Sequence, residues 1–316
     1  MSEYFLGVDG GQSSTTAIIG DENGRLLGIG RGGPCNHVSA SEARARFVNA
    51  IRGSVRAACS EAGLDADTIR FASACLGFSG GPADKQTILG QILTSDRMLV
   101  TDDAAIALSG ALGGEPGIVI IAGTGSIAFG RNAQGRTARA GGWGYLFGDE
   151  GGGFWIVREA VRAALRWEEG WGSPTALRAM LLDSTGARNG NDLMHRCYTP
   201  EFSRARIASL ATVVNSAAEN GDPLALKILG QAAGELATLA RAVRGQLFRS
   251  PEPVRCAYTG GVFRSRILRT RFRESLEFEP GLVATPPLHD PAAGALLEAY
   301  RAIGPIPYGM NHPFPE

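Results

Sequence analysis

The sequence predicts an α/β protein of two lobes, each built on a mixed sheet, with a central cleft between the lobes. Its 316 residues are more than a single hydrophobic core usually organises. Two hairpin meanders of like design begin near residues 4 and 117, and each is followed by helices and single strands. A duplicated domain explains this order better than one doubly wound sheet, because each unit begins with a meander.

The first lobe is expected to span residues 1–115. Apolar runs separated by turns predict its meander, and apolar positions at helical spacing predict the long helix that follows. The predicted strands are 4–8, 15–20, 25–30, 71–78 and 98–101, and the predicted helices are 41–62, about 83–93, and 104–112.

The second lobe is expected to span residues 116–316 and to repeat this order. Its last helix, at about 291–303, could pack back on the first lobe. The predicted strands are 118–122, 127–130, 254–258 and 282–284, and several helices are expected between 153 and 247.

Composition limits the classes of partner. The chain has 31 basic and 31 acidic residues, so no net field attracts nucleic acid or an anionic membrane, and a small-molecule partner is expected. Lys85 and Lys227 are the only lysines, so a Walker A phosphate loop is excluded.

The cysteines and the apolar segments indicate a reduced, soluble protein. Five scattered cysteines without CxC or CxxC spacing do not suggest zinc, an iron–sulfur cluster or redox exchange. The first residues lack a basic segment and a long apolar segment, and no later stretch approaches 18 uninterrupted apolar residues. A cytoplasmic location is therefore expected.

Two glycine turns with hydroxyl side chains could bind phosphate. The first is Asp9–Thr15, where backbone N–H groups and serine hydroxyls can face phosphate oxygens and the carboxylate of Asp9 can hold a hydrated Mg²⁺. The second, Ala122–Ser126, repeats this chemistry in the second lobe. A third glycine pair, Gly260 and Gly261, follows a late strand where adenine could lie on the backbone. Each is an ordinary turn by itself, but the pair of phosphate turns is much more specific.

In this order the three segments resemble the phosphate-1, phosphate-2 and adenosine motifs of the actin-like ATPase (ribonuclease H-like) superfamily. The segment GGWGYLFGDEG at 141–151 resembles the signature of N-acetylglucosamine kinases in the wider BadF/BadG/BcrA/BcrD ATPase group. The resemblance covers nearly the whole chain. It implies an ATP-dependent, Mg²⁺-using kinase that phosphorylates the 6-hydroxyl of N-acetylglucosamine or a related amino sugar. Glucosamine and N-acetylmuramate remain alternative substrates, and relatives make a homodimer plausible.

The resemblance also implies roles for individual residues. Asp103, which follows a strand and opens a helix, would face the sugar 6-hydroxyl as general base. The residues implied to line the sugar site are Asn36, His37, Ser79, Gly142, Trp143, Gly144 and Asp149. Those implied to contact the nucleotide are Gly10, Gly11, Gln12, Ser13, Thr124, Gly125, Ala208, Gly260, Gly261 and Ser265. The first turn has Gln12 and Ser13 where relatives commonly have Gly and Thr, so nucleotide affinity could differ.

Four other interpretations compete. Residues 28–33 match the dinucleotide fingerprint GxGxxG, but Pro34 and a loop follow instead of a helix. Residues 77–81 match the GxSxG elbow of a hydrolase, which could use Ser79 with Asp222 or Asp183 and His289. That interpretation leaves the paired glycine turns unexplained. The scattered cysteines count against an activator ATPase with an iron–sulfur cluster, and a non-catalytic sugar sensor would have lost the base or a phosphate turn.

Overall fold

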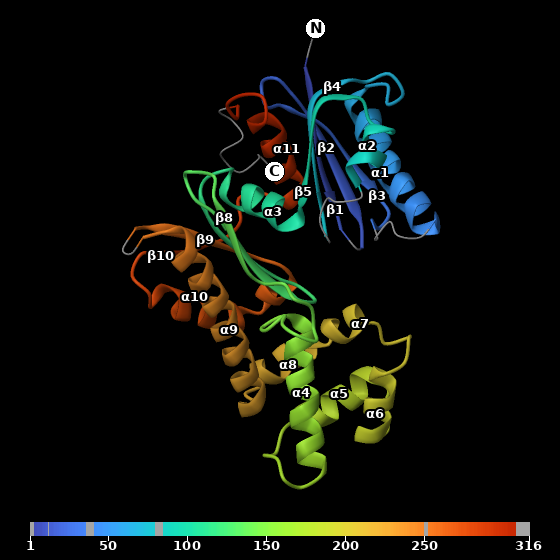
Figure 1. The fold of residues 1–316 in the computed structure, drawn as a ribbon. Coiled ribbons are helices and arrows are strands. Elements are labelled where there is room, and N and C mark those ends of the chain that lie inside the picture. Colours follow the sequence, from blue (N-terminus) through green and yellow to red (C-terminus); the bar gives the residue numbers. More distant parts are fainter. Residues whose placement is uncertain (1–2, 12, 36–40, 80–84, 250–251, 308–316) are drawn as a thin grey trace. The chain divides into compact units, whose positions relative to one another are not determined.

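The computed structural model describes residues 3–11, 13–35, 41–79, 85–249 and 252–307. The described chain divides into two compact units, one formed from 1–116 together with 287–316 and the other from 117–286 (Figure 1). No helix in these described ranges has both the length and the apolar character that a membrane crossing requires.

A five-stranded mixed sheet forms the centre of the first unit. Its strands are β1 (Tyr4–Gly10), β2 (Thr15–Asp21), β3 (Leu26–Gly32), β4 (Phe71–Phe78) and β5 (Ser95–Asp102). They lie in the order β3-β2-β1-β4-β5, with the β1–β2–β3 meander antiparallel and β1, β4 and β5 parallel. The parallel strands therefore end at the same edge of the sheet.

Helices cover both faces of this sheet (Figure 1). On one face α1 (Ser41–Ala62) packs on β2 and β3, and the short α2 (Lys85–Gly90) leads into β5. On the other face α11 (Pro291–Arg301) packs on β1 and β4 and crosses α3 (Asp103–Leu112). Buried apolar side chains of α11, Leu296 among them, meet Phe5, Ile18 and Ile106 in this layer.

Two glycines of the GxGxxG match, Gly28 and Gly30, have a packing role together with the intervening Gly32, whereas no atom of the described residues lies within 4 Å of a Cβ at the last motif glycine, Gly33. Gly28, Gly30 and Gly32 alternate along β3, and a Cβ at each would overlap a backbone carbonyl of α1. Their absent side chains let α1 lie directly on the strand. The motif therefore lies within a strand that packs against a helix, and the dinucleotide interpretation is wrong.

The second unit repeats the sheet of the first. Its strands are β6 (Gly117–Ala122), β7 (Ser126–Arg131), β8 (Thr137–Gly141), β9 (Val254–Thr259) and β10 (Leu282–Thr285). Their order, β10-β9-β6-β7-β8, has the antiparallel β6–β7–β8 meander and the parallel β6, β9 and β10 at the same places as in the first sheet. The predicted duplication is confirmed, with β8 as a strand that sequence analysis missed.

Helices make up the rest of the second unit. They are α4 (Gly153–Glu168), α5 (Leu177–Thr185), α6 (Gly190–Cys197), α7 (Arg204–Ser209), α8 (Ala211–Glu219), α9 (Pro223–Leu247), the 3₁₀ turn η1 (Gly261–Arg264) and α10 (Arg266–Glu277). Helix α9 packs on the meander and on α10, while α4 joins α9 to α5, α7 and α8. One apolar core runs through the sheet and these helices except α7, whose Ile207 packs with Val157 and Phe202 in a smaller cluster.

Candidate active site

The carboxyl ends of three parallel strands bring predicted residues together in the first unit. Asp9 pairs in register with Gly77, and Phe78 pairs with Asp102. The residues that follow, Ser79 and Asp103, therefore lie side by side where β4 and β5 end. The Ser79 hydroxyl donates a hydrogen bond of 2.7 Å to Oδ2 of Asp103.

Asp103 is the first residue of α3, but its side chain does not cap that helix. The N-cap residue is Asp102, which makes no side-chain capping bond. The carboxylate of Asp103 is partly exposed and accepts a hydrogen bond from Ser79, which fixes its orientation where β5 ends. This geometry suits a general base.

Asp9 lies at the end of β1, near the carboxylates of Asp103 and Asp290. Burial first, and then the charges of Asp103 and Asp290, raise its pKa to about 6. Asp290 is the N-cap of α11 and accepts a 2.8 Å bond from the N–H of Ala293. It reaches Asp9 because α11 packs against β1. Sequence analysis missed Asp290: Asp-Pro signals a helix start, but its place beside Asp9 depends on tertiary packing.

The chemistry of these carboxylates fits a hydrated Mg²⁺. At neutral pH Asp9 is mostly ionised against the repulsion of its neighbours, which a divalent cation would relieve. No group of three or more His, Cys, Asp or Glu side chains in the described ranges is placed to hold a metal by itself. Mg²⁺ commonly keeps several waters and binds one or two carboxylates together with substrate phosphates, which needs no such group.

The first phosphate turn is held by its own backbone. The N–H of Gly11 donates to the carbonyl of Ser14, and the carbonyl of Gly11 accepts from Cys35, each at 2.9 Å. Gly10 lies against the ring of Phe78, where a Cβ would overlap it, and Ser13 is exposed. The predicted Gln12, Asn36 and His37 lie outside the described residues.

Four predicted nucleotide residues line one pocket of the second unit. It has a volume of about 480 Å³ and lies among the second phosphate turn, α7, α8 and the start of α10. Thr124, Ala208, Gly261 and Ser265 all contribute to its wall. Pockets of this size bind small organic molecules, commonly with a few polar groups on a largely apolar wall.

Sequence analysis missed other polar residues of this pocket. The hydroxyl of Ser265, which also caps α10, lies 2.5 Å from Oδ1 of Asn215, and Thr212 lines the wall one turn earlier on α8. Only the fold brings α8 to this place, so no local pattern could have identified them. Gly260 and Gly125 do not line the pocket. Gly260, at φ 104°, packs on the backbone of Ala122, and a Cβ at Gly260 would overlap the carbonyl oxygen of Ala122.

The predicted sugar segment begins where β8 ends. Gly142 donates a 2.9 Å hydrogen bond to the carbonyl of Ser126, which attaches the segment to the second phosphate turn. Gly142 and Gly144 have φ values of 73° and 80°, and Trp143 is 64% exposed with Arg139 stacked 4.8 Å from its ring centre. Asp149 is buried.

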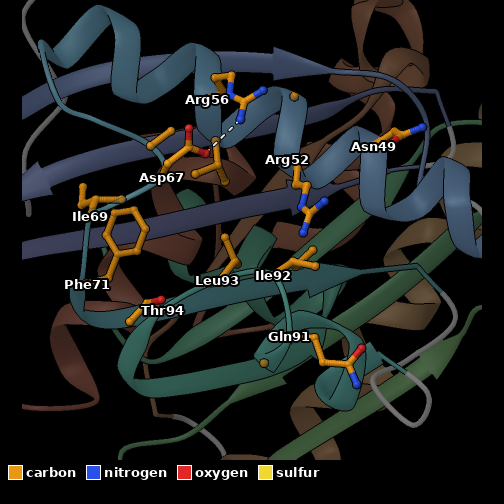
Figure 2. Close-up of a pocket in the computed structure, with 14 residues that line it drawn as sticks. Asn49, Arg52, Arg56, Asp67, Ile69, Phe71, Gln91, Ile92, Leu93 and Thr94 are labelled. Carbon is orange, nitrogen blue, oxygen red and sulfur yellow. Dashed lines mark hydrogen bonds and ion pairs between the residues drawn. The ribbon is translucent and has the colours of Figure 1, made fainter.

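A second pocket lies away from these residues. It has a volume of about 660 Å³ and lies between α1 and the segment that leads into β5 (Figure 2). Arg56 forms a 3.0 Å ion pair there with Asp67, and both side chains are more than two-thirds exposed. Phe71, at its wall, begins β4, whereas Ser79 follows the end of that strand. This pocket contains none of the predicted residues.

The hydrolase interpretation loses Asp222 as the carboxylate that would orient a histidine. The oxygens of Asp222 accept bonds from Thr175, Ala176 and Ala225, and the last of these caps α9. The carboxylate of Asp222 therefore caps the start of α9. Ser79 donates its hydrogen bond to the carboxylate of Asp103, whereas the hydrolase interpretation requires an imidazole as the base that accepts it.

Comparisons with known proteins agree with this arrangement. Residues 6–299 match the model of the BadF/BadG/BcrA/BcrD ATPase family. The N-acetylmuramic acid/N-acetylglucosamine kinase of Clostridium acetobutylicum is 32% identical over 304 residues, which cover 94% of this chain and 98% of that protein. The N-acetyl-D-glucosamine kinase of Dictyostelium discoideum is 32% identical over 316 residues, with 95% and 98% covered. The crystal structure of a candidate N-acetylglucosamine kinase from Chromobacterium violaceum matches with a TM-score of 0.76, 30% identity, and 93% and 98% of the two chains covered.

Proposed function

Because the chain belongs to the BadF/BadG/BcrA/BcrD ATPase family, we propose that it is an ATP-dependent kinase that phosphorylates the 6-hydroxyl of an amino sugar, with N-acetylglucosamine as the favoured acceptor. Two kinases of N-acetylated amino sugars at 32% identity over nearly their whole length support this acceptor class. The observation that carries the proposal is the Asp103 carboxylate, oriented by Ser79 at the strand end beside Asp9.

The residues divide the reaction between them. Asp103 holds the acceptor hydroxyl in line with the γ-phosphorus and accepts its proton as the new P–O bond forms, while ADP leaves with the electron pair of the broken bond. Gly10, Gly11 and Ser13 of the first turn and Thr124 of the second bind phosphate oxygens, and the pocket with Ala208 and Ser265 holds the adenosine. Asn36, His37, Gly142, Trp143 and Gly144 contact the sugar.

Asp9 has a supporting role toward the metal. Its carboxylate would hold Mg²⁺ through water or directly, and Mg²⁺ would supply positive charge to the phosphates during transfer. Because burial, and then the neighbouring carboxylates, raise the pKa of Asp9, a bound cation would also keep Asp9 ionised under mildly acidic conditions.

Release of ADP tests the proposal. Purified protein with Mg²⁺ and ATP is assayed with N-acetylglucosamine, N-acetylmuramate, glucosamine and glucose, against a blank without sugar and an ester substrate. We expect stimulation by at least one amino sugar and no ester cleavage. Ester cleavage without stimulation by any sugar would instead favour a hydrolase.

Two substitutions separate the roles of the paired side chains. Asp103→Asn cannot accept the proton and should lower kcat by at least about 10²-fold while nucleotide binding changes little. Ser79→Ala removes only the orienting bond and should lower kcat by about tenfold or less. Substantial turnover by Asp103→Asn would contradict the base role, and complete loss in Ser79→Ala with an intact fold would make Ser79 the reacting group.

A further inference from the structure

The GDEG part of the sugar signature lies against the second phosphate turn. The N–H of Gly153 donates to the carbonyl of Gly123 at 2.8 Å, and that of Phe154 to the carbonyl of Thr124 at 3.0 Å. The hydroxyl of Ser126 donates to the carbonyl of Glu150 at 2.6 Å. Residues 149–154 therefore bind the turn along its whole length.

Asp149 is at the centre of this contact. Its side chain is 6% exposed, and its Oδ1 accepts a bond of 3.4 Å from the N–H of Ser126. The carboxylate occupies the space beside Gly125 in which a side chain would lie, so that a Cβ there would be 2.7 Å from Oδ1. The carboxylate of Asp149 therefore occupies the space that a side chain at position 125 would need, which explains why this position is glycine.

Two features of Asp149 are energetically unfavourable by themselves: its carboxylate is buried, and its backbone is in the left-handed conformation. Asp149 has a φ of 62°, and no other described residue except glycine has a positive φ. A left-handed backbone conformation is unfavourable for a non-glycine residue, and burying a carboxylate is costly unless hydrogen bonds compensate. Such strain persists where the surrounding structure enforces it, which is common at functional sites.

We propose that Asp149 is a positioning residue for the second phosphate turn: it fixes the backbone of Gly125 and Ser126 so that the turn can receive the nucleotide phosphates. This inference rests on the proposed function. It differs from the sugar contact that the resemblance implied, because the carboxylate is buried against the turn. The backbone carbonyl of Ser126 also accepts a hydrogen bond from the N–H of Gly142, so Ser126 joins the turn to the sugar segment.

Nucleotide affinity measured without sugar separates the two roles. Asp149→Gly removes the carboxylate and tolerates a φ of 62°, whereas Asp149→Asn tolerates this φ nearly as well and keeps an oxygen acceptor for the N–H of Ser126. Calorimetry with ADP and Mg²⁺ should show about tenfold weaker binding for Asp149→Gly and a change of less than about threefold for Asp149→Asn.

The control is Asp183→Gly, the same substitution at an exposed position of α5. It should lower the melting temperature through helix propensity while leaving ADP affinity within about twofold of the unmodified protein. Ser126→Ala, which keeps Asp149 and removes the bond to Glu150, provides a second test and should also weaken ADP binding several-fold.

The possible outcomes are distinct. If Asp149→Gly binds ADP normally and only its KM for sugar rises, Asp149 contacts the sugar and the inference is overturned. If Asp149→Gly fails to fold, Gly125→Ala replaces it, because the added Cβ would overlap the carboxylate of Asp149 and displace it from the turn. Normal ADP affinity in Gly125→Ala then overturns the inference. If the unmodified protein binds ADP but phosphorylates no sugar, only the proposed function is contradicted. If the unmodified protein binds no nucleotide, both the proposed function and the inference about Asp149 are contradicted.

Discussion

At the scale of single residues, the carboxyl group of Asp9 shows a conflict between function and stability. It is partly buried at the end of a central strand near the charges of Asp103 and Asp290, and these surroundings raise its pKa from 3.8 to about 6. The native protein therefore binds a proton more tightly than the unfolded chain does. Stability from this group is fully present below pH 3.8 and is lost as the pH rises through 6.

Asp9→Asn should remove this pH dependence. Around pH 7.5 we expect the variant to be about 2–3 kcal/mol more stable than the unmodified protein, because the buried charge is gone, whereas near pH 4 the two should be alike. Urea unfolding at several pH values measures the difference. The exposed Asp67→Asn is the control, with a change of at most about 1 kcal/mol. A gain that is the same at every pH would contradict this explanation.

The site could be predicted from the sequence only in part. Thr124 lies in a glycine turn after a strand, and its pattern predicted a phosphate contact, whereas the role of Asp103 was predicted from the family resemblance. Asn215 lies in α8 and Asp290 caps α11, and both helices are placed by packing against elements far away in the chain, so no local pattern marks these two residues as part of a site. Asp149 was identified by its motif, but its burial against Gly125 depends on a three-dimensional contact.

At the scale of elements, glycine spacing determines how closely helices pack on the sheets. The alternating glycines of β3 place α1 directly on the strand, and Gly294 of α11 similarly lies on the backbone of α3 near Gly110. Such contacts leave no room for a methyl group. The cost of adding one depends on whether the nearest atom is backbone, which cannot move aside, or a side chain.

Gly30→Ala and Gly53→Ala form a matched pair that tests this dependence. A Cβ at Gly30 would overlap the carbonyl oxygen of Ser54, whereas Gly53 in α1 has nothing within 4 Å of its Cβ position. We expect Gly30→Ala to lower the free energy of unfolding by about 3 kcal/mol or more. Gly53→Ala should raise it by about 0.5–1 kcal/mol, because alanine favours a helix. Urea unfolding measures both, and equal effects would contradict the packing argument.

Element bounds were predictable where burial gives a clear pattern. Helix α1 and strand β4 lie where expected because an amphipathic helix and a short apolar run have strong periodic signals. Strand β8, with the sequence TARAG, was missed because its partly exposed residues show no apolar run. Strand β5 begins at Ser95 instead of 98 because polar residues pair with β4 there.

At the scale of the whole molecule, the two units differ in how the chain forms them. The second unit is continuous from 117 to 286, whereas the first needs residues from both ends of the chain. Helix α11 covers one face of the first sheet, where Phe5, Cys75 and Leu296 share a core. Without α11, the apolar side chains of this face would be exposed to water.

Fragments of the chain should therefore behave differently. Residues 117–286 alone should unfold cooperatively in urea, because the unit contains its own sheet and core. Residues 1–116 alone should not, whereas 1–116 joined to 287–316 by a flexible linker should regain a cooperative transition. Circular dichroism during denaturation tests each fragment. A cooperative transition in 1–116 alone would show that α11 is dispensable.

The late position of α11 in the chain also sets an order of events during synthesis. A ribosome adds about 5–20 residues per second from the N-terminus, and domains generally fold as they emerge. Here the unit that is begun first must be completed last, because its sheet waits for residues 291–301 while all 170 residues of 117–286 are made. For roughly 10–40 seconds the nascent first sheet would have one uncovered apolar face, which is the kind of surface from which chaperones protect nascent chains.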